Sequence, residues 1–74
     1  MNTEKNMTVF YDCDGKVTEI PVVLNEKDTY EDLTRKIGQN SETVLVFCDG
    51  QPVPLDDVVS AGKITILKVT FDGH

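Results

Sequence analysis

The segment at residues 43–54, TVLVFCDGQPVP, carries the pattern that decides the fold of this chain. Its apolar run, Val44–Cys48, has the length and the β-branched content of a strand. Asp49-Gly50 follows, and this dipeptide favours a tight hairpin turn, because type I′ turns require positive φ at both central positions. Two prolines in residues 51–54 remove backbone donors, so only a short extended piece is expected there.

A second hairpin is predicted nearer the start of the chain. Residues 7–12 and 17–22 read as strands, and Asp14-Gly15 lies between them. Pro21 cannot donate to a strand ladder, so the second strand is expected at an edge of the sheet. In the first strand, either Val9 and Tyr11 or Thr8 and Phe10 could face the core, and the sequence does not decide between them.

One helix is predicted within residues 28–38. Asp28 or Thr29 can cap its first amides, and each has an acidic residue three positions later, which is the spacing of a capping box. Gly38 favours the left-handed conformation that ends a helix. The apolar residues that share one helical face are Tyr30, Leu33 and Ile37.

The remaining segments complete the order of elements. Residues 39–43 are a polar connection, residues 55–62 a loop with room for a 3₁₀ turn, and residues 64–71 the last strand. The order strand, strand, helix, strand, short strand, strand predicts an α+β fold in which one helix packs on a sheet.

The length and composition predict a single small domain. No apolar run approaches the roughly 20 residues that span a bilayer, and the first six residues lack the apolar stretch of a secretory signal. We therefore expect a cytoplasmic monomer. We expect residues 1–6 to form a disordered lead, residues 7–71 the domain, and residues 72–74 a flexible tail.

The charge and the reactive residues exclude several functions. Thirteen acidic and seven basic residues give a net charge of −6, which argues against nucleic acid and favours a basic protein partner. Two cysteines are too few for a disulfide scaffold or a four-thiolate metal site. The single histidine has no partner with which to form a metal site or a catalytic triad, and no pair of side chains offers a nucleophile with its base. We therefore predict neither a metal site nor an enzyme.

The chain resembles the ubiquitin-like β-grasp proteins, and most closely the small archaeal modifier proteins and the ThiS/MoaD-type sulfur carriers. Residues 29–37, 43–54 and 64–69 carry the resemblance, in the order and with the spacing of that family. It implies a mixed sheet of four to five strands packed on one helix, in the order ββαβ(β)β. It also implies that Val44, Val46 and Cys48 face the helix, while Leu45 and Phe47 lie on the outer face.

The resemblance implies a function for the C-terminal tail. An E1-type enzyme uses ATP to adenylate the terminal carboxyl group, so the chain itself needs no bound cofactor. The product is joined to a lysine of a target protein, or is converted to a thiocarboxylate that supplies sulfur to a synthase. If chains form, the acceptors on this protein are lysines: Lys5, Lys16, Lys27, Lys36, Lys63 and Lys68.

The tail residues Asp72, Gly73 and His74 depart from the usual Gly-Gly ending. Either Asp72-Gly73 occupies the diglycine position and His74 is extra, or Gly73 is the first of the pair and His74 replaces the second. The alternative function is therefore a non-covalent interaction module of the same fold.

Analogy with the family also predicts where partners bind. Leu45, Phe47 and Leu67 are expected to form an apolar patch that docks the activating enzyme, and Lys68 and Phe71 are expected to contact it beside the tail. In such a sheet Cys13 and Cys48 lie at opposite ends, so we expect two free thiols.

Overall fold

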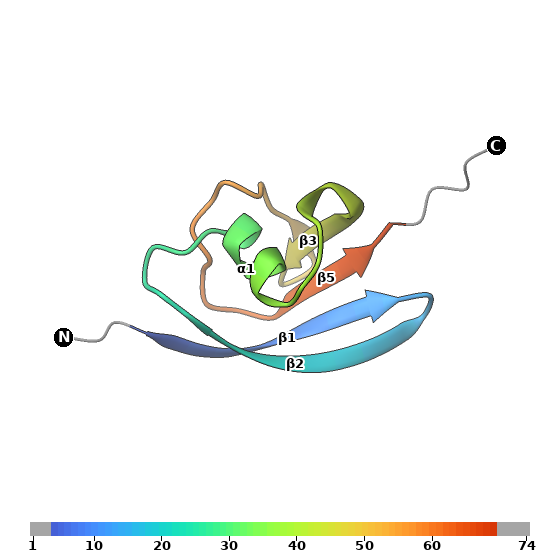
Figure 1. Cartoon of the computed structure of the whole chain (residues 1–74), viewed down its shortest axis with the longest axis horizontal. Helices are drawn as coiled ribbons and strands as arrows, with labels where there is room; N and C mark the ends of the chain where they lie inside the picture. Colours follow the sequence, from blue (N-terminus) through green and yellow to red (C-terminus); the bar gives the residue numbers. More distant parts are fainter. Residues whose placement is uncertain (1–3, 70–74) are drawn as a thin grey trace.

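A five-stranded sheet with one helix packed against it makes up the computed structural model, which describes residues 4–69 (Figure 1). This architecture confirms the predicted α+β, β-grasp fold. The elements in chain order are β1 (Lys5–Cys13), β2 (Lys16–Leu24), α1 (Tyr30–Lys36), the 3₁₀ helix η1 (Ser41–Thr43), β3 (Val44–Cys48), β4 (Gln51–Pro52) and β5 (Ile64–Lys68).

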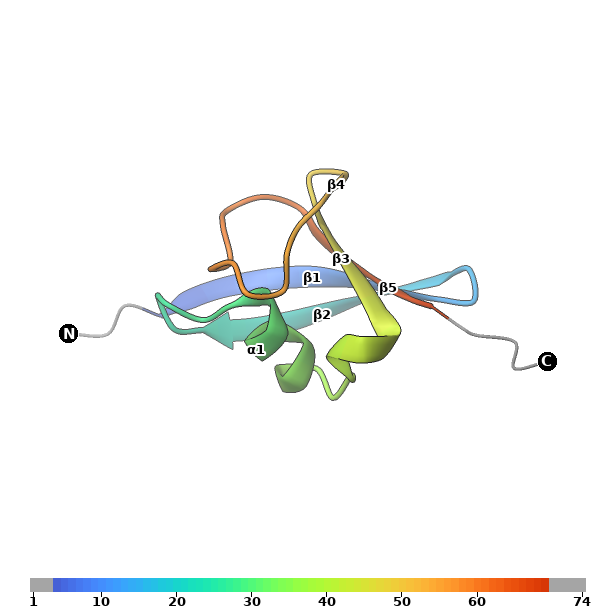
Figure 2. The same ribbon diagram turned by 90° about the horizontal axis from the view of Figure 1, so that it is seen from above.

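The sheet is mixed, as the resemblance implies. Its strands follow the spatial order β2-β1-β5-β3-β4. The neighbours β1 and β5 are parallel, and the other three neighbouring pairs are antiparallel. Because β1 and β5 run in the same direction, the start of β1 and the end of β5 lie at opposite ends of the sheet (Figure 2). Lys5 and Lys68 occupy these two positions.

The β1–β2 hairpin is longer than the sequence predicted. Lys5 pairs with Leu24, and the Lys5 ammonium also donates a hydrogen bond to the carbonyl oxygen of Val59 at 2.9 Å. Lys5 and Asn6 therefore belong to the sheet rather than to the expected disordered lead. Their strand conformation depends on this cross-strand partner, which no local pattern at residues 1–6 reveals.

Both predicted hairpin turns have the backbone geometry that their residues favour. The φ angles are 54° at Asp14 and 80° at Gly15, and 52° at Asp49 and 82° at Gly50. Two consecutive residues with positive φ are the mark of a type I′ turn, which matches the right-handed twist of the flanking strands.

Pro21 lies on an edge strand, as predicted. Cys13 and Lys16 flank a two-residue turn and so form a hydrogen-bonded pair, and such pairs alternate along the ladder. The pair Thr8 and Pro21 is then of the other kind, in which the backbone nitrogen points away from the partner strand. The nitrogen of Pro21 thus faces the open edge, where no ladder bond is lost.

The core lies between α1 and the face of the sheet toward the helix, called here the inner face. Val9 is fully buried and Tyr11 packs against the core, so the first of the two open assignments for β1 is correct. Val44 and Val46 are buried and Cys48 packs against them, as implied for β3. The buried apolar residues are Val9, Val22, Leu24, Tyr30, Leu33, Val44, Val46, Val59, Ile64 and Ile66.

Helix α1 begins with the predicted capping box, and Thr29 is the cap. The Thr29 hydroxyl accepts from the Asp32 amide at 3.3 Å, and the Asp32 carboxylate accepts from the Thr29 amide at 3.0 Å. The Thr29 hydroxyl also donates to this carboxylate at 3.1 Å, and the two hydrogen bonds that the carboxylate accepts, from the Thr29 amide first and then from its hydroxyl, lower the pKa of Asp32. Two loop carbonyls, of Asp57 and Leu55, accept from the amides of Tyr30 and Glu31, so the helix start has no unpaired amide.

The C-terminal end of α1 also follows the prediction. Gly38 has a φ of 79°, and its amide donates to the carbonyl oxygen of Arg35 at 3.0 Å. The next amide, of Gln39, donates to Thr34 at 2.9 Å. A left-handed residue thus satisfies the last carbonyls and turns the chain toward η1.

Tyr11 joins the β1–β2 hairpin to the segment after the helix. Its hydroxyl donates to Gln39 Oε1 at 3.0 Å. Burial, followed by the nearby Cys13 and Asp14, raises the pKa of Tyr11 above its usual 10.0. The phenol therefore stays protonated, and remains a donor, throughout the neutral range.

Two expectations for the second half of the chain differ from the structure. The 3₁₀ turn lies at Ser41–Thr43, where Asn40 caps it by accepting from the Glu42 amide, and not within residues 55–62. Strand β5 ends at Lys68, although the Val69 amide still donates to Thr43 at 2.9 Å. The last expected strand residues, 70 and 71, lie outside the described part.

Candidate functional site

The face of the sheet opposite the helix, called here the outer face, carries a cluster of apolar side chains. Leu45 and Leu67 are direct partners on β3 and β5, and alternation places Phe47 on the same face. Leu45 is 51% exposed, while Phe47 and Leu67 are half-buried. The structure thus brings together the three residues predicted to form a docking patch.

Phe10 extends this cluster across a further strand. The register aligns Phe10 of β1 with Thr65 of β5, and Thr65 with Phe47 of β3. Phe47 in turn pairs with Pro52 of the edge strand β4. The outer patch is therefore defined by four residues from three strands, which are Phe10, Leu45, Phe47 and Leu67.

Sequence reasoning missed Phe10 because it left the inward set of β1 undecided. Val9 and Phe10 are both apolar, and the strand alone does not show which of them the core takes. The pairing of β1 with the distant strand β5 decides which residue is buried, since Val9 pairs with the fully buried Ile64 and Phe10 pairs with Thr65.

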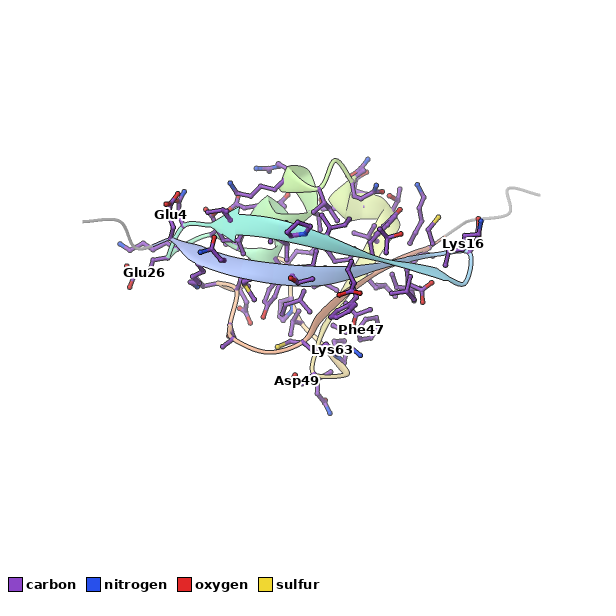
Figure 3. All side chains as sticks on the ribbon, turned by 90° about the horizontal axis from the view of Figure 1, so that it is seen from below. Glu4, Lys16, Glu26, Phe47, Asp49 and Lys63 are labelled. Carbon is purple, nitrogen blue, oxygen red and sulfur yellow. The ribbon has the colours of Figure 1, made fainter. Side chains whose placement is uncertain are left out.

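Charged side chains border the outer patch. The ammonium nitrogen of Lys63 lies 5.1 Å from the centroid of the Phe10 ring. Asp12 pairs with Leu67 and Glu19 pairs with Phe10, so both carboxylates lie on the same face. Figure 3, which looks at the molecule from below, shows Phe47, Lys63 and Asp49 near one another. The patch is apolar at its centre and charged at its rim, which is the anatomy of many protein interfaces.

Of the two residues predicted to contact the enzyme beside the tail, only Lys68 lies within the described part of the chain. Lys68 pairs with the buried Val44 and therefore belongs to an inward-facing row, apart from the outer patch. The remaining predicted site residues, Phe71, Asp72, Gly73 and His74, lie outside the described residues. Strand β5 nevertheless links the two predicted sites, because it presents Leu67 on the outer face and leads directly into the tail.

Other parts of the described chain offer little chemistry. Cys13 and Cys48 are free thiols; β5 separates their strands, and the register aligns Cys48 with Val9, four residues along β1 from Cys13. Residues 4–69 contain no group of three His, Cys, Asp or Glu side chains able to hold a metal ion. No helix in this range is long and apolar enough to cross a membrane.

One groove, of about 390 Å³, lies beside the start of β1. Its only ionisable side chain is Lys5, whose ammonium is already bonded to the Val59 carbonyl. The residues that line it are Lys5, Asn6, Met7, Thr8, Ala61 and Gly62. They do not pair a nucleophile with a base, so the groove has no catalytic arrangement of that kind.

Comparison with known proteins agrees with the fold and identifies the family. The family described as Small archaeal modifier protein 2 matches residues 7–70. A protein of that name from Haloferax volcanii is 31% identical over 67 residues, which cover 90% of this chain and all of the relative. An uncharacterised protein from Archaeoglobus fulgidus is 34% identical over 64 residues, covering 86% of this chain and 91% of the relative.

No solved structure gives a significant match to the chain. The family match nevertheless spans every strand and the helix, apart from the first two residues of β1. The chain therefore belongs to the small archaeal modifier protein 2 family of ubiquitin-like proteins.

Proposed function

We propose that the protein is a ubiquitin-like modifier whose C-terminal carboxyl group is activated by an E1-type adenylating enzyme that docks on the outer patch. The observation that carries the proposal is the placement of Leu67 in the outer patch on the strand that leads into the tail. An enzyme bound to this face lies beside β5, and the residues that follow this strand can then reach its active site.

The tail is long enough for this role. The five residues after Val69 span at most about 17 Å when fully extended. Gly73 has no Cβ, which lets other backbone approach closely inside a narrow active site. The catalytic groups belong to the partner, and the modifier presents only its carboxylate.

The proposed reaction has two steps. The terminal carboxylate attacks the α-phosphate of ATP, which forms an acyl adenylate and releases pyrophosphate. A sulfur donor then displaces AMP and leaves a thiocarboxylate, or a lysine amine of a target protein displaces it and forms an isopeptide bond. ATP is bound by the activating enzyme, and its use places the proposed activity in the cytoplasm.

A second candidate is a non-covalent interaction module that docks through the same outer patch. The residues Asp72, Gly73 and His74 favour it, because a bulky residue follows the glycine. The two candidates agree on the docking surface and differ only on whether the carboxyl group is activated.

Intact-mass spectrometry separates them. The full chain is incubated with ATP, a sulfide source and the activating enzyme of the same organism. We expect a mass increase that corresponds to the replacement of one oxygen by sulfur, located in the C-terminal peptide. The matched control combines Asp72→Gly with removal of His74, so that the chain ends in two glycines.

Each result has a distinct meaning. A mass shift in both proteins supports activation of the chain as it stands. A shift in the control alone overturns activation of this chain and favours the non-covalent module. No shift in either protein, with an enzyme that activates its other substrates, overturns the modifier proposal.

A further inference from the structure

A single fixed lysine stands at one end of the outer patch. We infer that Lys63 is a docking residue that pairs with a carboxylate on the surface of the activating enzyme, next to the apolar contact. The inference rests on the proposed docking function and specifies the chemistry of the partner. It begins from the contacts that hold this exposed lysine in place.

The backbone of Lys63 is fixed by Asp49. The Asp49 amide donates to the Lys63 carbonyl oxygen at 2.8 Å, and the Lys63 amide donates to Asp49 Oδ1 at 2.9 Å. Asp49 is in the β3–β4 turn, 14 residues earlier in the sequence. The two hydrogen bonds therefore set the direction in which the lysine side chain leaves the sheet.

Gly62 makes this arrangement sterically possible. A Cβ at position 62 would lie 2.8 Å from Asp49 Oδ2, closer than real Cβ contacts. The φ of Gly62 is 144°, a conformation that side chains disfavour. The residue before the lysine therefore has no room for a side chain while Asp49 holds its position.

Phe10 fixes the other end of the lysine. The ammonium lies 5.1 Å from the ring centroid, within the range of a cation–π contact. An exposed lysine normally loses rotamer freedom when it enters an interface, which weakens binding. Here the backbone and the head group are already held, so less freedom remains to be lost.

Among residues 4–69, Lys63 is the one basic side chain on the outer face, which also carries the carboxylates of Asp12 and Glu19. Lys5, Lys16 and Lys68 belong to inward-facing rows. The other basic side chains among residues 4–69, which are Lys27, Arg35 and Lys36, lie in the β2–α1 connection and on the helix. A partner that covers the outer patch therefore meets one cation there, and a carboxylate is its complement.

The position of Lys63 also orients the partner. Lys63 precedes β5, whereas Asp12 is aligned with Leu67 near the other end of that strand. A partner with a carboxylate opposite Lys63 and a basic group opposite Asp12 fits in one direction only. In that direction the tail end of β5 always meets the same part of the enzyme.

Calorimetric titration of the activating enzyme with four full-length proteins tests the inference. They are the wild type, Lys63→Glu, Phe47→Ala and the matched control Lys27→Glu, which makes the same charge change on a surface turn. At about 50 mM NaCl we expect Lys63→Glu to weaken binding about tenfold, because it places two carboxylates opposite each other. Lys27→Glu should change binding less than twofold, and at about 500 mM NaCl the Lys63→Glu effect should shrink.

The outcomes distinguish the role of Lys63 from the docking role of the outer patch as a whole. Weak binding by Phe47→Ala with wild-type binding by Lys63→Glu overturns the role of Lys63 and leaves the docking patch intact. Wild-type binding by both variants overturns the patch itself. Equal effects of Lys63→Glu and Lys27→Glu mean that only net charge matters, and this also overturns the inference.

A fifth variant tests whether Phe10 positions the lysine. Phe10→Leu keeps an apolar side chain but removes the aromatic ring. In the wild type, the ring current should shift the NMR signals of the Lys63 side-chain methylenes upfield, and the variant should lose this shift while binding a few-fold more weakly. An unshifted lysine in the wild type overturns the positioning role of Phe10.

Discussion

At the scale of single residues, Asp32 completes the capping box of α1 and makes a pH-sensitive contribution to stability. Its carboxylate accepts hydrogen bonds from the amide and the hydroxyl of Thr29, which favour the charged form and lower its pKa. A group with a lowered pKa stabilises the fold above its pKa in the unfolded chain, about 3.9, and this contribution is lost as the pH falls through the folded pKa.

We therefore expect Asp32→Asn to lower the melting temperature at pH 7 and to resemble the wild type in acid. The difference between the two proteins should shrink as the pH falls below about 4, because the wild-type carboxyl then becomes protonated. Thermal melts followed by circular dichroism at several pH values measure it. Asp56→Asn, which alters an exposed aspartate outside the capping box, is the control. A difference in melting temperature that stays constant down to about pH 2 would contradict the role of the Asp32 charge.

Thr29→Ala tests the other half of the capping box. The Asp32 amide would lose its side-chain acceptor, and removal of an N-cap threonine typically costs about 1 kcal/mol. For a domain of this size, that cost corresponds to a fall of roughly 4–8 °C in melting temperature. Thr29→Ser keeps the hydroxyl and should stay close to the wild type. Equal melting temperatures for the alanine and serine variants would mean that the cap does not stabilise α1.

Phe47 is expected to matter more for binding than for folding. It is half-buried on the outer face, where its neighbours are cross-strand side chains rather than the closed core. Phe47→Ala should therefore cost only about 1 kcal/mol of stability, while weakening binding to the activating enzyme by about tenfold or more. Val23→Ala, on the same face at the far end of β2, is the matched control. A large loss of stability with unchanged binding would show that Phe47 has a structural role only.

Residue types predicted some positions of the site and left others undecided. The family resemblance placed Leu45, Phe47 and Leu67 on the outer face, and in the structure they alternate with the buried residues of β3 and β5. Phe10 and Lys63 were not found, since their roles depend on a strand neighbour and on a turn far away in the sequence. Local periodicity shows that a strand has two faces, but only packing shows which face is covered.

At the scale of elements, the β2 edge is protected from pairing by Pro21. The nitrogen of Pro21 faces the open edge, so the edge lacks one donor near its middle. We expect Pro21→Thr to keep the fold and to promote self-association at high protein concentration, because a new N–H becomes available to another strand. Sedimentation velocity over a concentration series measures the effect. Pro54→Thr, in the loop after β4, is the control, and an unchanged monomer fraction in Pro21→Thr would contradict the protective role.

Elements with local signals were predicted well, and elements set by distant contacts were not. The helix, its capping box and both Asp-Gly turns follow from residues within four positions of one another. The extension of β1 to Lys5 depends on Leu24, and the buried position of Val59 depends on the start of the helix, where its amide donates to Asp28. Such contacts join segments that are too far apart in the sequence for a local pattern to reveal them.

At the scale of the whole molecule, the parallel pairing of β1 with β5 separates the two ends of the described chain. The start of β1 is at one end of the sheet and the end of β5 at the other (Figure 1). The outer patch lies between them, because its residues on β1 and β5 are Phe10 and Leu67. The order of elements along the chain suggested this arrangement through the family resemblance. Under the proposed function, this arrangement lets one end of the chain act as the reactive tail while the start of β1 lies at the other end of the sheet.

This separation predicts different effects for the two possible fusions. A folded domain joined before Met1 should leave both docking and thiocarboxylate formation intact, because it attaches at the end of the sheet opposite the tail. The same domain joined after His74 should leave docking within a few-fold of the wild type and abolish thiocarboxylate formation, because the terminal carboxylate is then replaced by a peptide bond. Calorimetry with the activating enzyme and intact-mass spectrometry measure the two properties separately. Loss of docking in the N-terminal fusion would show that the partner also covers the β1 start, and the outer patch would then be only part of the docking surface.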